Sequence, residues 1–364
     1  MKTKFRCAVL GLLCLLALAG CASAPEDAVP YSEDAVYAFL EEAALAENSQ
    51  ATEYFRTEDG DSLSVDDVDV VVQEALNADG ILNYYVSEYS WTSRPVGKDC
   101  VKLEVTFTYE EDAYRGGTLP EAASTAEGVH IVIQALNEGQ FTIPLRITGE
   151  SWSEADAEQM LSVAVDNADC PSTFDCSYLL APAADVPRQM LVLFYEPTVD
   201  EATYSAYKTE MDAALDTMAA EILGQGLEDD EDLYRAAHDA VLDATEYNTD
   251  MAEDMDVNGL TESREMGPDY TAYGAVVTGS TVCYGYATAY KLLCDRLELP
   301  CWTVAGTADG EDHQWNLICL EGEDYLVDCT WDDASWDQYS YFLCAPDLES
   351  HRPVEDWIYG WCYC

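Results

Sequence analysis

The sequence predicts an α+β fold for this chain of 364 residues. Its C-terminal part joins a helix with an apolar stripe, at 286–297, to two strands separated by a tight turn, and its middle part alternates helical and strand-like runs. Apolar residues at i, i+3, i+4 and i+7 are typical of an amphipathic helix, whereas strict alternation is typical of a half-buried antiparallel strand. Because a chain this long exceeds what one hydrophobic core usually serves, we expect two or three domains.

Residues 1–20 predict a secretory signal peptide rather than a structural element. Three basic residues open the chain, and the apolar run at 8–20 is shorter than the ~20 residues that a membrane-spanning helix needs. The run ends in LAGC with Cys21 last, which resembles the lipobox of bacterial lipoproteins. This resemblance implies that Cys21 is lipidated and that residues 21–34 tether the body to a membrane. The alternative is an ordinary signal peptide followed by an incidental cysteine.

Such a leader predicts an extracytoplasmic protein, anchored to the cell membrane through Cys21. It also affects the cysteine count, because Cys7 and Cys14 would leave with the signal and the lipidated thiol would be blocked. Eleven of the fourteen cysteines then remain, and an odd number leaves at least one thiol free or paired between chains. Candidate disulfides join cysteines that are close in sequence: Cys170 with Cys176, and Cys362 with Cys364.

The charge is strongly unbalanced, with 71 acidic and 16 basic residues and a net charge of −55. Such a surface repels nucleic-acid phosphates and favours cationic ligands or basic protein segments, so we expect no nucleic-acid partner. Solubility or adaptation to salt would explain the same charge. The four histidines are dispersed and no Cys-x-x-Cys or His-x-x-x-His spacing occurs, so we expect no metal and no cofactor.

The region 35–200 is expected to hold small α+β accessory units. A short helix is predicted at 35–46, and strands are predicted at 128–133 and 141–147 around a turn at 137–139. Two related helix–strand stretches lie about ninety residues apart, which favours a weak internal duplication. In the first stretch a helix at 65–76 leads to a strand at 101–109, and in the second a helix at 154–165 leads to a strand at 190–195.

A helical zone precedes the region that carries the chemistry. One helix is expected at 203–223 and a second through residue 242, because the acids at 229–232 favour the N-terminal end of a helix dipole. His238 lies on the second helix, where a structural role is more common than a catalytic one. The acidic stretch 247–270 is expected to be a loop.

Cys283 is the first candidate for chemistry. A turn signal at 279–280 precedes the apolar stripe, so Cys283 is expected in the first turn of a helix. There the helix dipole and unpaired N–H groups stabilise a thiolate, and the Cys283 backbone N–H is available to a developing oxyanion. Gly285 is expected to let a substrate approach closely. Tyr273 is one candidate for a second oxyanion donor.

His313 and Asp328 are the expected base and its orienting group. Strands predicted at 313–320 and 325–331 flank a tight turn, and an even-length turn makes His313 and Asp328 project from the same sheet face. The same alternation of side chains places Cys319 and Cys329 on opposite faces of the sheet, so these two should not form a disulfide with each other. Taken alone, His313 would be explained as a core histidine, Asp328 as a solvated aspartate and Cys283 as a disulfide cysteine. Their order and context in the sequence favour a nucleophilic triad instead.

Three blocks of sequence, VCYGYATAYKLLCDRLELPCWTVAGT, HQWNL and YLVDCTWDD, resemble the signature blocks of the transglutaminase-like superfamily. The resemblance covers about residues 205–350. It implies a papain-like core in a catalytic domain at 201–364, with the nucleophile helix packed on an antiparallel sheet. Carried onto this sequence, it makes Cys283 the nucleophile, His313 the base and Asp328 the residue that orients the imidazole.

The resemblance implies attack of a thiolate on an amide carbonyl to give an acyl-enzyme. Capture of that intermediate by water gives hydrolysis, and capture by an amine gives transglutamination. We expect a surface-anchored peptidase or amidase that acts on peptide or protein, cell-wall peptide included. The alternatives are a protein-crosslinking transglutaminase and a non-catalytic lipoprotein for peptide binding or adhesion.

Overall fold

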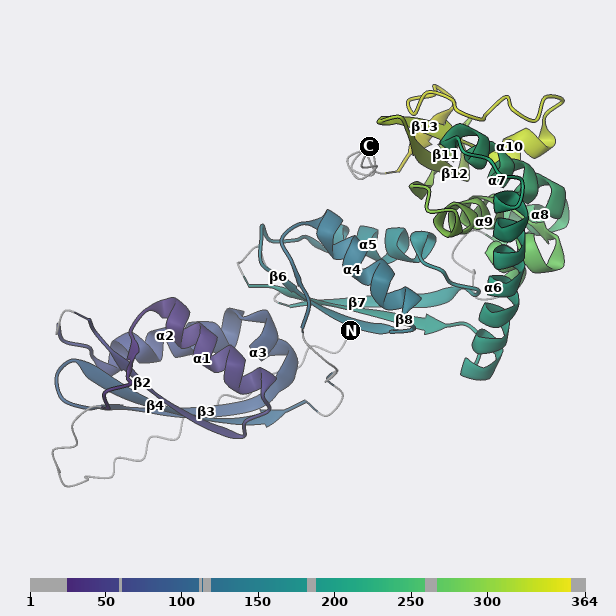
Figure 1. Ribbon diagram of the computed structural model, residues 1–364. Helices are drawn as coiled ribbons and strands as arrows, with labels where there is room; N and C mark the ends of the chain where they lie inside the picture. Colours follow the sequence, from purple (N-terminus) through teal and green to yellow (C-terminus); the bar gives the residue numbers. More distant parts are fainter. Residues whose placement is uncertain are drawn as a thin grey trace. The chain divides into compact units, whose positions relative to one another are not determined.

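The computed structural model describes residues 25–58, 61–110, 113, 119–181, 188–258 and 267–354. Helices and sheets are mixed along the chain (Figure 1), so the predicted α+β class is confirmed. The predicted signal peptide, its lipidation site Cys21 and the C-terminal pair Cys362 and Cys364 lie outside the described residues. Within the described ranges, no helix is long and apolar enough to cross a membrane.

The chain divides into two compact units. The first comprises Met1–Ala123, Pro144–Glu154 and Leu179–Leu191, and the second comprises Ser124–Ile143, Ala155–Tyr178 and Val192–Cys364. This division runs through the second β-sheet, so it differs from the expected boundary near residue 200. The expected domain limits therefore stay predictions.

The first sheet combines four strands with three helices. Its strands are β1 (Val29–Pro30), β2 (Gln50–Arg56), β3 (Val86–Pro95) and β4 (Cys100–Tyr109), in the order β1-β2-β4-β3. The helices of this region are α1 (Glu33–Leu45), α2 (Val65–Ala78) and α3 (Gly80–Tyr85). Strand β4 is antiparallel to both neighbours and alternates buried with more exposed residues, as the sequence predicts.

The second sheet has the same strand order as the first. Its strands are β5 (Glu121–Ala122), β6 (Thr142–Ile147), β7 (Phe174–Ala181) and β8 (Met190–Pro197), in the order β5-β6-β8-β7. Its helices are α4 (Thr125–Asn137) and α5 (Glu154–Asn167). In each sheet a two-residue edge strand pairs in parallel with its neighbour. This shared order favours the duplication, which stays a prediction.

The strand predicted at 128–133 is wrong, because these residues lie in α4. Ser124 caps the helix by accepting a hydrogen bond from the Glu127 N–H, and the buried residues recur at helical spacing. Neighbouring β-branched residues suggested a strand, but this buried face decides the conformation. The predicted hairpin turn is instead the C-terminal end of α4, where Gly139 has φ +77°.

The third part of the chain carries the predicted catalytic residues. Its helices are α6 (Glu201–Leu223), α7 (Asp230–Ala244), α8 (Thr249–Asn258), α9 (Cys283–Arg296) and α10 (Cys329–Ala334), with short turns at Pro268–Tyr270 and Gly274–Thr278. The Asp229 carboxylate caps α7, as its acidic start predicts. The predicted loop at 247–270 is wrong in part, because α8 occupies ten of its residues.

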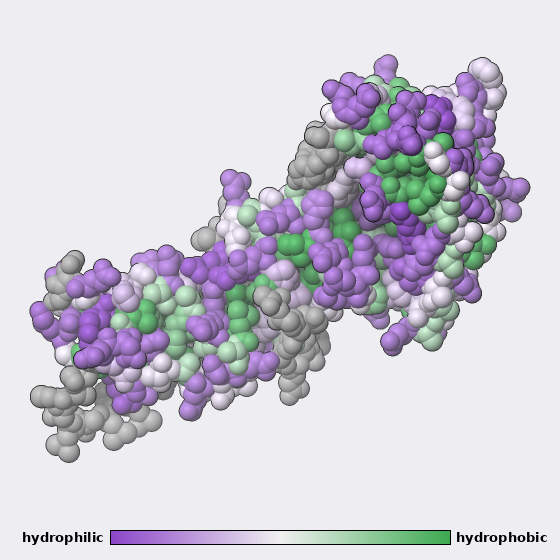
Figure 2. Space-filling model, viewed as in Figure 1, coloured by the Kyte–Doolittle hydropathy of each residue, from purple (hydrophilic) through white to green (hydrophobic). Residues whose placement is uncertain are grey.

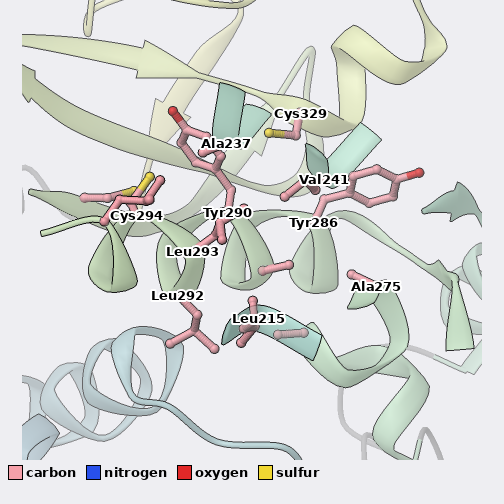
Figure 3. Close-up of a cluster of buried hydrophobic side chains, with 14 of the residues drawn as sticks. Leu215, Ala237, Val241, Ala275, Tyr286, Tyr290, Leu292, Leu293, Cys294 and Cys329 are labelled. Atoms are coloured by element: carbon pink, nitrogen blue, oxygen red, sulfur yellow. The ribbon is translucent and has the colours of Figure 1, made fainter. Parts of the chain in front are cut away.

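An antiparallel sheet supports the nucleophile helix. This sheet has the strand order β13-β12-β11-β14, and its strands are β11 (Cys301–Ala308), β12 (Glu311–Leu320), β13 (Glu323–Val327) and β14 (His351–Pro353). Two further short strands pair with each other: β9 (Glu246–Tyr247) and β10 (Ser280–Thr281). Helix α9 packs on β11 and β12 and also on α6 and α7. Figure 3 shows Tyr286 and Tyr290 on the side of Cys329, whereas Leu292 lies on the side of Leu215. Helix α9 is therefore buried on several sides.

The predicted disulfide between Cys170 and Cys176 is wrong, because both thiols are free. Cys319 is disulfide-bonded whereas Cys329 is free. The prediction that Cys319 and Cys329 are not bridged to each other is therefore confirmed.

Candidate active site

Cys283 is the first residue of α9, as the sequence predicts. The N-cap position is held by Val282, whose side chain has no acceptor atom to satisfy the first N–H groups of the helix. The thiol is half-buried. A thiolate at this position would therefore face the positive end of the helix dipole without a competing capping group.

Two predictions about the surroundings of Cys283 are wrong. Gly285 is buried, and a Cβ there would lie 2.1 Å from Thr281 Oγ1 and 2.7 Å from the Thr271 carbonyl oxygen. This glycine therefore serves helix packing rather than substrate approach. Tyr273 is buried too, and its hydroxyl donates a hydrogen bond of 2.6 Å to Glu210. It is thus not positioned as the second oxyanion donor.

His313 and Asp328 come together as the strand parity predicts. His313 lies on β12, and its Nε2 is 2.8 Å from Asp328 Oδ2. Strand β13 pairs with β12 in the expected register, with Leu326 opposite Leu317. The predicted strand at 325–331 is wrong in its second half, because it ends at Val327 and Asp328 caps α10.

Asp328 is held from several directions. Its Oδ1 accepts hydrogen bonds from the backbone N–H groups of Thr330 and Trp331, at 3.0 and 3.1 Å, and its own N–H donates to the Tyr341 carbonyl. Burial of this side chain raises its pKa, but the hydrogen bonds from His313 and His351 outweigh that effect and hold the pKa below its usual value. Asp328 is therefore a fixed carboxylate.

The surroundings of His313 raise the pKa of its imidazole. Burial lowers its pKa, but the hydrogen bond to Asp328 and the interaction with the Cys283 side chain raise it to about 10. Since Nε2 is engaged by Asp328, Nδ1 is the nitrogen left for Cys283. The site can therefore hold an imidazolium beside a thiolate, with the aspartate behind it.

His351 is a part of the site that the sequence did not reveal. It lies on the edge strand β14, and its Nε2 is 3.1 Å from the same Asp328 Oδ2. No motif or spacing pointed to it, because it reaches the site only through pairing of β14 with β11. In the described part of the chain, His313, Asp328 and His351 are the one group whose geometry could suit a metal ion. Both imidazoles are already satisfied by hydrogen bonds to the carboxylate.

Aromatic and acidic side chains border Cys283. The rings of Tyr270 and Tyr284 stack with centroids 4.8 Å apart. Burial raises the pKa of Tyr270, and the charges of Cys283, Asp166 and Asp312 raise it further, so these groups are its neighbours. Asp166 belongs to α5, outside the region that the sequence assigned to the catalytic domain. Sequence reasoning missed this contribution.

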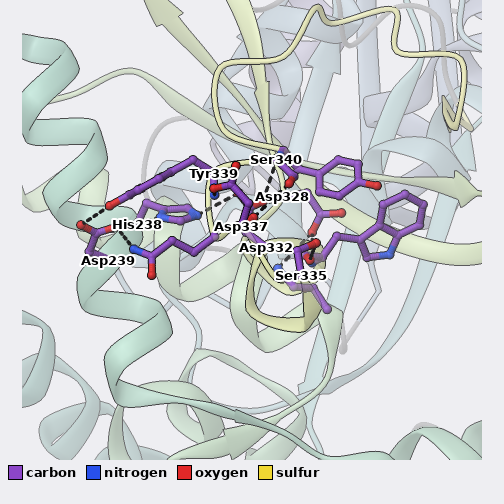
Figure 4. A network of polar contacts seen from close by, with 12 residues as sticks. His238, Asp239, Asp328, Asp332, Ser335, Asp337, Tyr339 and Ser340 are labelled. Carbon is purple, nitrogen blue, oxygen red and sulfur yellow. Dashed lines mark hydrogen bonds and ion pairs between the residues drawn. The ribbon is translucent and has the colours of Figure 1, made fainter.

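A second buried histidine–aspartate pair involves Asp332 of α10. His238 Nε2 on α7 is 3.1 Å from Asp332 Oδ2, and His238 Nδ1 is 3.1 Å from Asp239 Oδ1. Asp332 also accepts a hydrogen bond from the Tyr341 N–H. Figure 4 shows His238, Asp239 and Asp332 in one network of polar contacts. This pair ties α7, α10 and the following loop together, which agrees with a structural role for His238.

Comparison with known proteins shows a local sequence similarity to two peptidases. The kyphoscoliosis peptidases of Homo sapiens and Mus musculus are each 33% identical over 100 residues, which covers 21% of this chain. The match spans only 15% of the length of these relatives. No protein-family model matches the chain.

Two solved structures are similar at low sequence identity. The crystal structure of a transglutaminase matches with 15% identity and a TM-score of 0.28, over 52% of this chain and 51% of that one. A proposed cysteine protease from Cytophaga hutchinsonii matches with 14% identity and a TM-score of 0.27, over 50% of this chain and 68% of that one. Superpositions at these scores carry no functional argument. The sequence similarity to the peptidases and the grouping of Cys283, His313 and Asp328 in one site agree with the resemblance of the three sequence blocks to the transglutaminase-like superfamily.

Proposed function

We propose that this chain is a surface-anchored cysteine enzyme that forms an acyl-enzyme with peptide or protein amides and hydrolyses them. The observation that carries the proposal is the position of His313 between Cys283 and a buried carboxylate, Asp328. A base whose far nitrogen is fixed by a carboxylate presents its other nitrogen to the nucleophile in one orientation. The half-buried thiol remains accessible to a substrate.

In the proposed reaction the Cys283 thiolate attacks the amide carbonyl carbon and forms a C–S bond. The C–N bond breaks as the His313 imidazolium gives its proton to the leaving amine, which leaves a thioester. Water then attacks the thioester, with His313 accepting the proton of the water. The C–S bond then breaks, the carboxylic acid departs, and the Cys283 thiolate and the His313 imidazolium are regenerated.

Crosslinking is the second candidate, because the same thioester can be attacked by a primary amine. The acids Asp166 and Asp312 border the tyrosine stack next to Cys283, and a net charge of −55 favours cationic partners. Figure 2 shows hydrophilic residues spread over most of the face in view. Acidic surroundings would concentrate lysine-bearing acyl acceptors near the thioester.

The proposed location is the outer side of a cell membrane, with lipid on Cys21 and with peptide or protein, cell-wall peptide included, as the substrate. The support is the leader sequence, with its basic start, apolar run and LAGC ending. Feeding an alkyne-labelled fatty acid to expressing cells should label the wild-type chain, and Cys21→Ala should abolish the label. A labelled Cys21→Ala chain would contradict the anchor.

The reaction is tested with the chain from Cys21 onward, wall peptides and unfolded proteins as substrates, and a labelled primary amine. Mass spectrometry of the products separates new carboxyl termini or deamidated glutamine, which indicate hydrolysis, from incorporated amine, which indicates transfer. Cys283→Ala should remove either product. Substrate binding without any product or covalent adduct would favour the non-catalytic binding protein and overturn the proposal.

A further inference from the structure

The edge strand β14 brings a second histidine to the triad carboxylate. His351 pairs with Ala308 on β11, and Ala308 pairs with Glu311 on β12. Because directly paired residues share a sheet face and every second residue returns to it, His351 projects from the same face as His313. The sheet therefore aims both imidazoles at the end of β13, where Asp328 lies.

A glycine permits this close approach of β14. Gly306 pairs with both His313 and Pro353. A Cβ at Gly306 would lie 2.2 Å from the Arg352 carbonyl oxygen and 2.5 Å from Trp315 Cη2. The position of His351 is thus built into the backbone of the sheet and does not depend on one surface contact.

Aromatic rings enclose His351. The centroid of its imidazole lies 4.7 Å from that of Trp331, 5.0 Å from that of Trp315 and 6.0 Å from that of Tyr341. His351 is only 3% exposed, so packing holds the ring in place and keeps water from Asp328. A polar side chain buried this deeply among rings needs its hydrogen bonds satisfied.

The hydrogen bonds to Asp328 show which nitrogen of each imidazole carries a hydrogen. A carboxylate only accepts, so the Nε2 atoms of both His313 and His351 carry the hydrogen toward Oδ2. His351 Nδ1 lies 2.9 Å from Ser350 Oγ. With two backbone N–H groups on Oδ1, Asp328 accepts four hydrogen bonds. All of its lone-pair directions are used, so the carboxylate cannot rotate without losing a bond.

We propose that His351 is a positioning residue for acyl transfer, which fixes Asp328 Oδ2 and shares its charge so that Asp328 holds the His313 ring in line with Cys283. In this role His351 acts through Asp328 and not directly on the thiol or the substrate. The effect on turnover rests on the proposed function. The effect on thiol reactivity does not, because it needs no substrate.

Two substitutions of His351 by side chains of similar shape separate the effect of its hydrogen-bond donor from the effect of its packing. His351→Gln places an amide N–H close to the position of the imidazole Nε2, whereas His351→Met fills similar space without a donor. We expect His351→Met to lower kcat roughly 10- to 100-fold at nearly unchanged KM, the size typical of lost outer-shell orientation. His351→Gln should stay within about threefold of the wild type. His351→Phe replaces the methionine variant if that one does not fold.

The second readout is the rate at which iodoacetamide alkylates Cys283, measured by peptide mapping at neutral pH. This rate should fall in His351→Met and be restored in His351→Gln, with thermal unfolding used to correct for the folded fraction. Equal rates in the two variants, per folded molecule, would overturn the positioning role. A wild-type chain that turns over no substrate defeats the proposed function alone, and the alkylation comparison still decides the role of His351.

Discussion

Two buried histidine–aspartate pairs, His313–Asp328 and His238–Asp332, use carboxylates at the start of and within α10, and of the two histidines His313 is the one beside Cys283. Asp328 and Asp332 are four residues apart in sequence, and each has a histidine Nε2 within 3.1 Å. Asp332 and His238 are at least as buried as Asp328 and His313. Burial and pairing therefore do not distinguish a catalytic pair from a structural one in this protein.

The two pairs differ in what faces the second ring nitrogen. His238 has a carboxylate at each nitrogen, from Asp332 and Asp239, so neither nitrogen is left to act on a substrate. His313 has a carboxylate only at Nε2, and its other side faces Cys283. One nitrogen fixed and one left for the thiol is the arrangement that a general base needs.

The two aspartates also differ in their protonation. Burial raises the pKa of Asp332, and its hydrogen bonds compensate only in part. Burial acts in the same direction on Asp328, but its hydrogen bonds from two histidines and from the Trp331 N–H bring the pKa below the usual value. More donors thus make Asp328 the stronger permanent charge, which suits a residue that stabilises an imidazolium.

The largest expected effect is the difference between Asp328→Asn and Asp332→Asn. Asp328→Asn keeps the size and removes the charge that orients His313, so kcat should fall about 10³- to 10⁴-fold. Asp332→Asn should leave kcat per folded molecule within about threefold of the wild type, since its partner His238 is structural. Steady-state kinetics on both variants measures this. Equal losses would remove the distinction between the two pairs.

Next in size is the stability cost of removing His238. His238→Ala leaves Asp332 buried without its partner and opens a cavity, so the free energy of unfolding should fall by about 3 kcal/mol. Urea unfolding followed by circular dichroism measures the change. Turnover per folded molecule should be retained. A variant with the free energy of unfolding of the wild type but with slow turnover would give His238 a functional role instead.

The pH dependence of stability should differ between wild type and His313→Gln. The folded-state pKa of His313, about 10, lies above the usual value near 6.5 of an unfolded chain. Its contribution is therefore complete below about pH 6.5 and is lost as the pH rises through about 10. Unfolding midpoints of both chains between pH 6 and pH 10.5, values chosen to bracket these two pKa values, test this. A constant difference between the chains would contradict the assigned imidazolium.

The smallest expected effect concerns the nucleophile helix. A glycine-to-alanine change inside a helix normally stabilises by up to about 1 kcal/mol, but Gly285→Ala should destabilise by about 1–3 kcal/mol because of its contacts with Thr281 and Thr271. Gly224→Ala at the end of α6 is the control, since the contacts of its added Cβ begin at 3.2 Å. Thermal unfolding of both variants decides it, and a more stable Gly285→Ala chain would refute the packing argument.

Local patterns predicted the nucleophile and the shared face of the base and its partner. The apolar stripe of α9 and the short turn between β12 and β13 are contained in a few consecutive residues, so their geometry follows from sequence alone. The end of β13 was missed, because Asp328 caps a new helix with the same carboxylate that orients His313. That double role breaks the strand pattern at a functional residue.

Long-range contacts explain the other misses. His351 reaches Asp328 only after β14 pairs with β11, and Asp166 comes from a helix far upstream in sequence. Neither position has a neighbouring motif. Helix α4 was misread because its β-branched residues favour strands locally, whereas burial of one helical face in the folded unit decides its conformation.

The most direct test of the site compares the alkylation of Cys283 with that of Cys176 in one chain. Cys176 reaches the surface, yet burial of its thiol and the charges of Asp166 and Asp175 raise its pKa to about 12. Cys283 has, in addition to acidic neighbours, a helix N-terminus and His313 beside it.

At pH 7, iodoacetamide followed by peptide mapping should modify Cys283 at least about tenfold faster than Cys176, and His313→Gln should remove most of that advantage. Equal rates at the two cysteines, or a rate at Cys283 that does not change in His313→Gln, would contradict a nucleophile activated by His313 and Asp328.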